Sequence, residues 1–253
     1  MKRSPTPTAL LISCLLPALL LCGAGAPSPA GAVDADEIIA KNIEATGGLE
    51  KIKAIQTAKF TGKFLAQGME LPFVMTQRRP DRLRIEVEVM GMTMVQCYDG
   101  TKGWSINPMT GSPDPQPMSE VENKSFALQA DMDGVLVDYR DKGYTVEYLG
   151  ESDVEGTAAH QLRVDTKQGT VNDIFIDKEY FMAIKVHSKV TVDAAEFESD
   201  SFMSDFKEVD GTVIPFAIET RMGETVVNQV MIEKVEYGVA VQDSIFIMPV
   251  KAE

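Results

Sequence analysis

The chain has 253 residues, of which 38 are acidic and 24 are basic, and its formal net charge is −14 at pH 7. This acidic balance argues against nucleic acid and anionic membrane surfaces as partners, because both repel it. The sequence has no P-loop, no G-x-S-x-G elbow and no dinucleotide fingerprint, so we expect neither catalysis nor a cofactor. His160 and His187 are the only histidines and lie without a metal-binding motif, so we expect no metal site.

The first segment of the chain is typical of a secretory signal peptide. Two basic residues precede the apolar run Ala9–Leu21, and small residues follow it. The run is shorter than the about 20 apolar residues that span a bilayer. Cleavage after Ala32 is the best small-x-small match. We therefore predict a signal peptide over residues 1–32, export from the cytosol, and a single domain over residues 33–253.

Cys22 offers an alternative way of processing this segment. Acylation of Cys22 would anchor the protein in a membrane, with the small residues up to Ala32 as a flexible tether. Leu21, however, stands where lipoprotein signals prefer a small residue. The free and the anchored product both remain open. In the free product Cys97 is the only cysteine left, so we expect no intramolecular disulfide and a buried thiol.

Short helices are predicted at two places in the chain. The first begins at Asp34 or Asp36 and ends at Gly47-Gly48, with a short turn over residues 50–54 after it. The second place follows residues 107–117, whose four prolines predict that no strand continues there. Beyond them, Ser119 and Glu122 form a capping-box pattern. We predict one or two short helices there, through about Val137.

The rest of the chain alternates apolar and polar residues. In residues 81–90 the apolar side chains of one face alternate with Arg and Glu on the other, which is typical of a strand with one solvated face. Residues 59–64, 71–75 and 92–97 follow the same pattern. Seven later strands are predicted over residues 144–150, 159–166, 171–177, 183–192, 197–206, 213–222 and 226–237. Short turns between sequential strands indicate an antiparallel meander.

These elements predict a mainly β (α+β) fold. About 11 antiparallel strands form one highly curved sheet, because an open sheet of that size curls or closes. The sheet would be an unclosed barrel, with the short helices as a lid over its concave face. So few helices would leave part of the interior unfilled, which favours a binding cavity.

Methionine is the residue type that points to the kind of ligand. Met75, Met90, Met92 and Met94 cluster around adjacent predicted strands, and their flexible, polarizable side chains adapt to ligands of variable shape. Such a lining suits an acyl chain. We predict that the ligand contacts lie on the apolar strand face and on the lid, at Phe64, Phe73, Met75, Leu83, Ile85, Val87, Met92, Met94, Phe126 and Leu128.

Three segments carry a resemblance to a known family. They are ADEIIAKNIEATGGLEKIKAI at residues 35–55, the run of residues 77–104 and SDFKEVDGTVIPFAIE at residues 204–219. The middle run contains RRPDRLR followed by an alternating strand and YDGTKGW. These residues resemble the outer-membrane lipoprotein-sorting proteins of Gram-negative bacteria, which include the periplasmic Lol carrier and the related mycobacterial lipid carriers.

The resemblance implies an unclosed barrel with a helical lid over a hydrophobic cavity, located in the periplasm. It implies a carrier or sensor for a lipid or an acylated ligand, such as a lipoprotein, without nucleotide hydrolysis. We expect a monomer that exchanges ligand with inner- or outer-membrane transfer proteins. In the sorting carrier a strand arginine holds the lid helices, but Arg82 and Arg84 lie on the predicted outer face, so neither takes that role.

Two alternatives to a carrier remain. One is a non-catalytic envelope module, anchored through Cys22, that docks a protein partner on the curved sheet; a cavity-free interior would favour it. The other is a hydrolase with an unrecognised site, which activity on generic ester or glycoside substrates would reveal.

Overall fold

The structure, a computed structural model, describes residues 34–66, 68–110, 112–167, 169–192 and 195–250. The predicted signal peptide, both processing sites and Cys22 lie outside the described residues. Within those residues, no helix is long and apolar enough to cross a bilayer.

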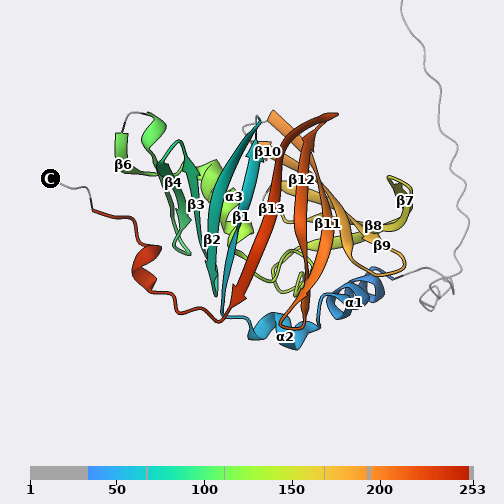
Figure 1. Cartoon of the computed structure of the whole chain (residues 1–253). Coiled ribbons are helices and arrows are strands. Elements are labelled where there is room, and N and C mark those ends of the chain that lie inside the picture. Colours follow the sequence, from blue (N-terminus) through green and yellow to red (C-terminus); the bar gives the residue numbers. More distant parts are fainter. Residues whose placement is uncertain (1–33, 67, 111, 168, 193–194, 251–253) are drawn as a thin grey trace, which may run out of the picture. The chain divides into compact units, whose positions relative to one another are not determined.

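One antiparallel sheet makes up most of the protein (Figure 1), in the strand order β6-β5-β4-β3-β2-β1-β13-β12-β11-β10-β9-β8-β7. The strands are β1 (Thr57–Ala66), β2 (Met69–Arg78), β3 (Arg82–Val89), β4 (Met92–Tyr98), β5 (Gly103–Asn107), β6 (Ser112–Pro117), β7 (Thr145–Val154), β8 (Thr157–Asp165), β9 (Thr170–Asp177), β10 (Ala183–Val192), β11 (Ala195–Val209), β12 (Thr212–Met222) and β13 (Thr225–Tyr237). The mainly β fold with an unclosed, antiparallel sheet is confirmed. The described strands number 13 rather than about 11.

The two additional strands are β5 and β6, at one edge of the sheet. The prediction that the proline-rich segment forms no strand is wrong, because β6 pairs with β5 although it reads SPDPQP. An edge strand hydrogen-bonds on one side only, so a proline there can direct its missing N–H away from the ladder. Gly103 accepts a further bond from the backbone N–H of Met118, at 2.9 Å, directly after β6.

The described residues also form three α-helices and two 3-10 turns: α1 (Ala35–Ala45), α2 (Leu49–Ala54), η1 (Pro108–Thr110), α3 (Glu120–Ala130) and η2 (Asp243–Ile245). The capping box predicted at Ser119 and Glu122 is present at the start of α3. The helix ends at Ala130, earlier than Val137. Its termination has a local cause, since Asp131 adopts an extended backbone conformation and its carboxylate accepts the backbone N–H of Asp133 at 3.0 Å, after which the chain forms turns.

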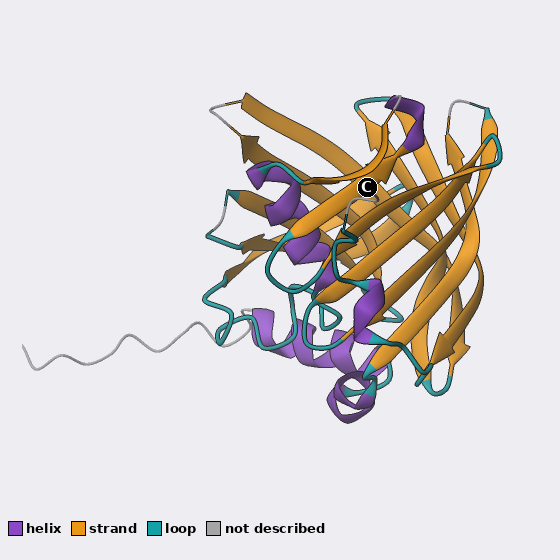
Figure 2. Cartoon of the chain, turned by 90° about the vertical axis from the view of Figure 1, so that its left-hand side faces the viewer, coloured by secondary structure: helices purple, strands orange, loops and turns teal. Residues whose placement is uncertain are grey.

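The sheet curves around the helices (Figure 2). Helices α1 and α3 pack on one face of the sheet, called the inner face below. Ile38 and Ile39 of α1 pack against β8 and β9, and Phe126 and Ala130 of α3 pack against β3 and β4. The two helices therefore cover separate parts of the inner face, near its two flanks.

The opposite, outer face is covered in part by the C-terminal segment, residues 239–250. Phe246 is 1% exposed and packs with Cys97 and Trp104. The indole Nε1 of Trp104 donates to the Phe246 carbonyl at 2.8 Å. Arg82, on the same face, pairs with the Asp243 carboxylate of the segment at 2.9 Å. The buried thiol predicted for Cys97 is thus confirmed, on the outer face.

Candidate functional site

The strand register places the predicted contact residues of β1 to β4 on one face. Met75 pairs with Ile85, and Phe73 pairs with Val87, which in turn pairs with Met94. Residues that pair directly across antiparallel strands point to the same side of the sheet. The face in question is the inner one, because Met75 and Ile85 pack beneath α3.

Several of these residues form a packed core rather than the wall of a cavity. Leu83 is 0% exposed and Phe126 is 7% exposed, and both lie in the cluster that joins α3 to the sheet. Phe73 is also buried, whereas Met92 is 38% exposed. Two cavities of the inner face are described below. Of the ten predicted contact residues, Leu128 lines the second cavity, and the other nine line neither. As ligand contacts, all ten stay a prediction.

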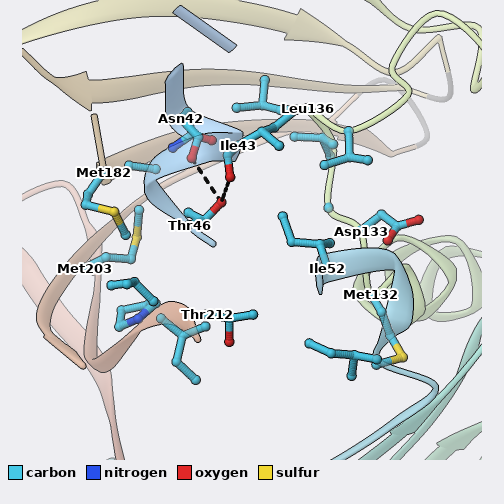
Figure 3. Close-up of a pocket in the computed structure, with 18 of the residues that line it drawn as sticks. Asn42, Ile43, Thr46, Ile52, Met132, Asp133, Leu136, Met182, Met203 and Thr212 are labelled. Carbon is cyan, nitrogen blue, oxygen red and sulfur yellow. Dashed lines mark hydrogen bonds between the residues drawn. The ribbon is translucent and has the colours of Figure 1, made fainter. Parts of the chain in front are cut away.

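A cavity of about 400 Å³ lies between the helices and the inner face of β1 and of β9 to β13. We call it the apolar cavity. In Figure 3, side chains from α1, α2, the loop after α3 and the strands surround it. Its apolar lining includes Ile43, Ile52, Phe60, Val186, Met203 and Phe206. Its volume lies within the about 300–1,000 Å³ usual for small-molecule pockets.

The polar groups that line the apolar cavity bond to the protein itself. The Asn42 amide donates to the Phe181 carbonyl at 2.7 Å, and the Thr46 hydroxyl bonds to carbonyls of its own helix at 3.0 Å. The hydroxyls of Thr212 and Tyr237 lie 3.0 Å apart and bond to each other. Because these groups already have partners, the cavity offers a ligand mainly hydrocarbon surface.

Arg79 connects three of the elements around the apolar cavity. Its guanidinium donates to the carbonyls of Ile52 at 2.8 Å and Ile55 at 2.7 Å, at the end of α2. It also pairs with the Asp133 carboxylate at 2.5 Å, in the loop after α3, and Lys53 pairs with the same carboxylate at 2.6 Å. Burial raises the pKa of Asp133, but the hydrogen bonds from Arg79 and Lys53 outweigh it, and the pKa lies below its ordinary value.

Sequence reasoning missed this role of Arg79, because RRP reads as a turn with a basic edge. It did place Arg82 and Arg84 on the outer face correctly. There Arg84 donates to the Ile245 carbonyl at 2.9 Å and lies over the Trp104 ring, with its guanidinium carbon 5.6 Å from the centroid. No local signal separates Arg79 from its neighbours, since its partners lie in distant segments.

A second cavity, of about 1,040 Å³, lies between α3 and the inner face of β9 to β11. Val135, in the loop after α3, lines both cavities. The strand residues change in character between them. Ile174, Val186 and Met203 line the apolar cavity, whereas residues further along the same three strands, among them Asn172, Ser188 and Ser201, line the second. We call the second one the polar cavity.

Comparison with solved structures identifies the architecture. A DUF1329 family protein from Desulfovibrio piger superimposes with a TM-score of 0.59 at 12% identity, over 84% of this chain and 96% of that one. A LolA superfamily protein from Nitrosomonas europaea superimposes with a TM-score of 0.58 at 13% identity, over 85% of this chain and 98% of that one. An outer membrane lipoprotein-sorting protein domain from Vibrio parahaemolyticus superimposes with a TM-score of 0.55 at 12% identity, over 83% of this chain and 94% of that one.

The chain has the fold of the LolA superfamily. These structures agree with the resemblance seen in the sequence, although the sequence matches no family profile and no curated protein. At such low identity the likeness concerns the fold, namely the open, curved LolA-type sheet with helices on its inner face. The residues at the site must therefore be judged by their own chemistry.

Proposed function

We propose that this protein is a non-catalytic periplasmic carrier or sensor that binds the acyl chain of a lipid or lipoprotein in the apolar cavity. The observation that carries the proposal is the lining of the cavity, which is mainly hydrocarbon and whose polar groups already have hydrogen-bond partners within the protein. Each buried CH₂ of an acyl chain contributes about 0.8 kcal/mol, so a long chain binds at micromolar concentrations or below.

The fold supports the same proposal. The similar structures include a LolA superfamily protein and a lipoprotein-sorting domain. Two cavities on the inner face also speak against a docking module with a filled interior. Export through residues 1–32, or anchoring through Cys22, would place the protein in the envelope, and the mass of the mature N-terminus distinguishes the two.

The first experiment identifies what the protein carries. Mature protein purified from the periplasm is analysed by native mass spectrometry, followed by lipid extraction. We expect a bound acyl compound that organic solvent removes. A clean apo mass, together with no uptake of a fluorescent monoacylglycerol, would refute the proposal.

A pair of matched variants locates the site. Val186 lies on the inner face of β10 and lines the apolar cavity, whereas Val171, on the neighbouring β9, pairs with Lys189 and points to the outer face. Val186→Phe fills the cavity and should weaken uptake of the fluorescent monoacylglycerol about tenfold or more, while Val171→Phe should leave it unchanged. Equal uptake by the two folded variants would place the ligand elsewhere.

A further inference from the structure

The sheet wall of the polar cavity carries neutral hydrogen-bonding side chains beside the apolar Val190 and Phe197. We call the row of neutral polar side chains that begins there the hydroxyl-amide band; it consists of Thr170, Asn172, Ser188, Ser201, Thr220 and Asn228. The first four line the cavity, and the register continues the band, since Ser201 pairs with Thr220 and Thr220 with Asn228. An inner sheet face made only for packing would be apolar at these positions.

The band is built into the sheet rather than scattered over its surface. Asn172 is 8% exposed and Thr170 is 9% exposed. The Ser188 hydroxyl donates to the Asn172 side-chain oxygen at 2.8 Å, which fixes the amide. The described residues supply no partner for the Asn172 amide nitrogen, so its N–H groups are available to a ligand.

The cavity carries no net positive charge in the described part of the chain. Its charged lining residues are Glu120 and Lys124 of α3, which pair with each other at 3.0 Å. Lys189 and Arg221, on the neighbouring strands, point to the outer face and away from the cavity, since Lys189 pairs with Val171 and Arg221 with Asp200. A phosphate or carboxylate would thus enter a partly buried site without a free counter-charge, which is unfavourable.

We propose that the hydroxyl-amide band binds the uncharged polar part of an amphiphile, one that bears hydroxyl or amide groups, next to the acyl site. This inference rests on the proposed function and specifies its ligand class. The shared wall residue Val135 places the two cavities next to each other, so one molecule could extend its chain into one and its headgroup into the other. Acylated glycerol or sugar and the amide groups of an acylated peptide share this chemistry.

The test compares three probes with the same acyl chain in competition with a fluorescent monoacylglycerol. They are monopalmitoylglycerol, a palmitoylated uncharged peptide amide and palmitoyl lysophosphatidic acid. We expect at least one neutral probe to bind about tenfold or more tightly than the phosphate probe, and the better neutral probe identifies the source of the headgroup. If the affinities of the three probes differ by less than tenfold, or if the phosphate probe binds more tightly than both neutral probes, the inference is overturned but acyl binding stands. No binding by any probe would refute the proposed function as well.

Variants connect the preference to the band. The double substitution Asn172→Leu and Ser188→Ala removes both partners of one hydrogen bond, so that no polar group is left unpaired in the fold. The double variant should reduce the preference for the neutral probe over the phosphate probe to about threefold or less, while all three probes still bind. Thr93→Val, at an exposed position of β4 that pairs with outward-facing Glu88, is the control and should keep the preference. If the double variant does not fold, the isosteric Thr170→Val serves instead. A folded band variant with the full preference would overturn the inference.

Discussion

At the scale of single residues, His160 shows how burial sets a chemical property. It is 7% exposed on the inner side of β8, its Nδ1 lies 3.3 Å from the Tyr148 hydroxyl, and its ring stacks on Phe181. Burial lowers the pKa of His160 below 6.5, and the nearby Lys178 lowers it further. The unfolded chain therefore binds the proton more readily than the folded one.

This shift predicts a pH dependence of stability. The free energy of unfolding should fall as the pH drops below 6.5 towards the lowered pKa of His160 in the folded state. His160→Phe keeps a ring between its neighbours and should flatten that slope. Urea unfolding at pH values on both sides of 6.5 measures it, and an identical slope in the variant would contradict the prediction.

Gly62 is a residue whose missing side chain matters. A Cβ there would lie 2.0 Å from the Met231 carbonyl oxygen, where the register of β1 and β13 shifts. Gly62→Ala should lower the free energy of unfolding by about 2 kcal/mol or more, as measured by urea unfolding. Gly223→Ala, in a turn with φ of +61° and no atom within 4 Å of the new Cβ, should cost about 1 kcal/mol. Equal losses would mean that the close approach is unimportant.

At the scale of elements, the C-terminal segment acts as a cover for the outer face. It buries Cys97, whose thiol also donates to the Phe246 carbonyl at 3.4 Å, and burial raises the pKa of Cys97 to about 12. We expect Cys97 to resist iodoacetamide at neutral pH, because the thiolate is the reactive form.

Phe246→Ala should loosen this cover. The variant should lose about 3 kcal/mol in the free energy of unfolding and react with iodoacetamide at Cys97 faster than wild type, as mass spectrometry would show. Tyr180→Ala, at a side chain that is 66% exposed, serves as a control without effect on either measurement. Unchanged alkylation of the Phe246 variant would mean that the segment does not protect the thiol.

At the scale of the whole molecule, the pairs around Asp133 connect α2, the end of β2 and the loop after α3. The carboxylate is 8% exposed, so removing its charge is costly. Asp133→Asn should lower the free energy of unfolding by about 2 to 3 kcal/mol at neutral pH and speed hydrogen exchange in residues 131–143. Asp138→Asn, which removes an ion pair of Lys53 at a carboxylate 39% exposed, should cost less than about 1 kcal/mol.

The lowered pKa of Asp133 also predicts how the stability difference between wild type and Asp133→Asn depends on pH. A carboxyl whose pKa is lower in the folded state stabilises the fold above its ordinary pKa of 3.8 and loses that contribution as the pH falls through the folded value. The difference between wild type and Asp133→Asn should therefore shrink in strong acid. A difference that stays constant there would exclude the charge as its cause.

The side chains that share a face of a strand can be predicted from the amino-acid sequence alone. Alternation with period two is a local property, so it alone assigns Met75, Ile85 and Phe73 to one common face, which the strand register bears out. The capping box of α3 is equally local. The proline-rich β6 was not predictable in this way, because only its position at a sheet edge makes the prolines acceptable.

The positions of the two cavities on that face depend on tertiary contacts. Helix α3 packs on Leu83 and Ile85, in the region where the sequence predicts ligand contacts. The apolar cavity arises instead where β1 pairs with β13, which places Phe60 next to Val235, and where Arg79 connects α2 to the loop after α3. These contacts join residues far apart in the chain, and long-range packing leaves no periodic signal in the sequence.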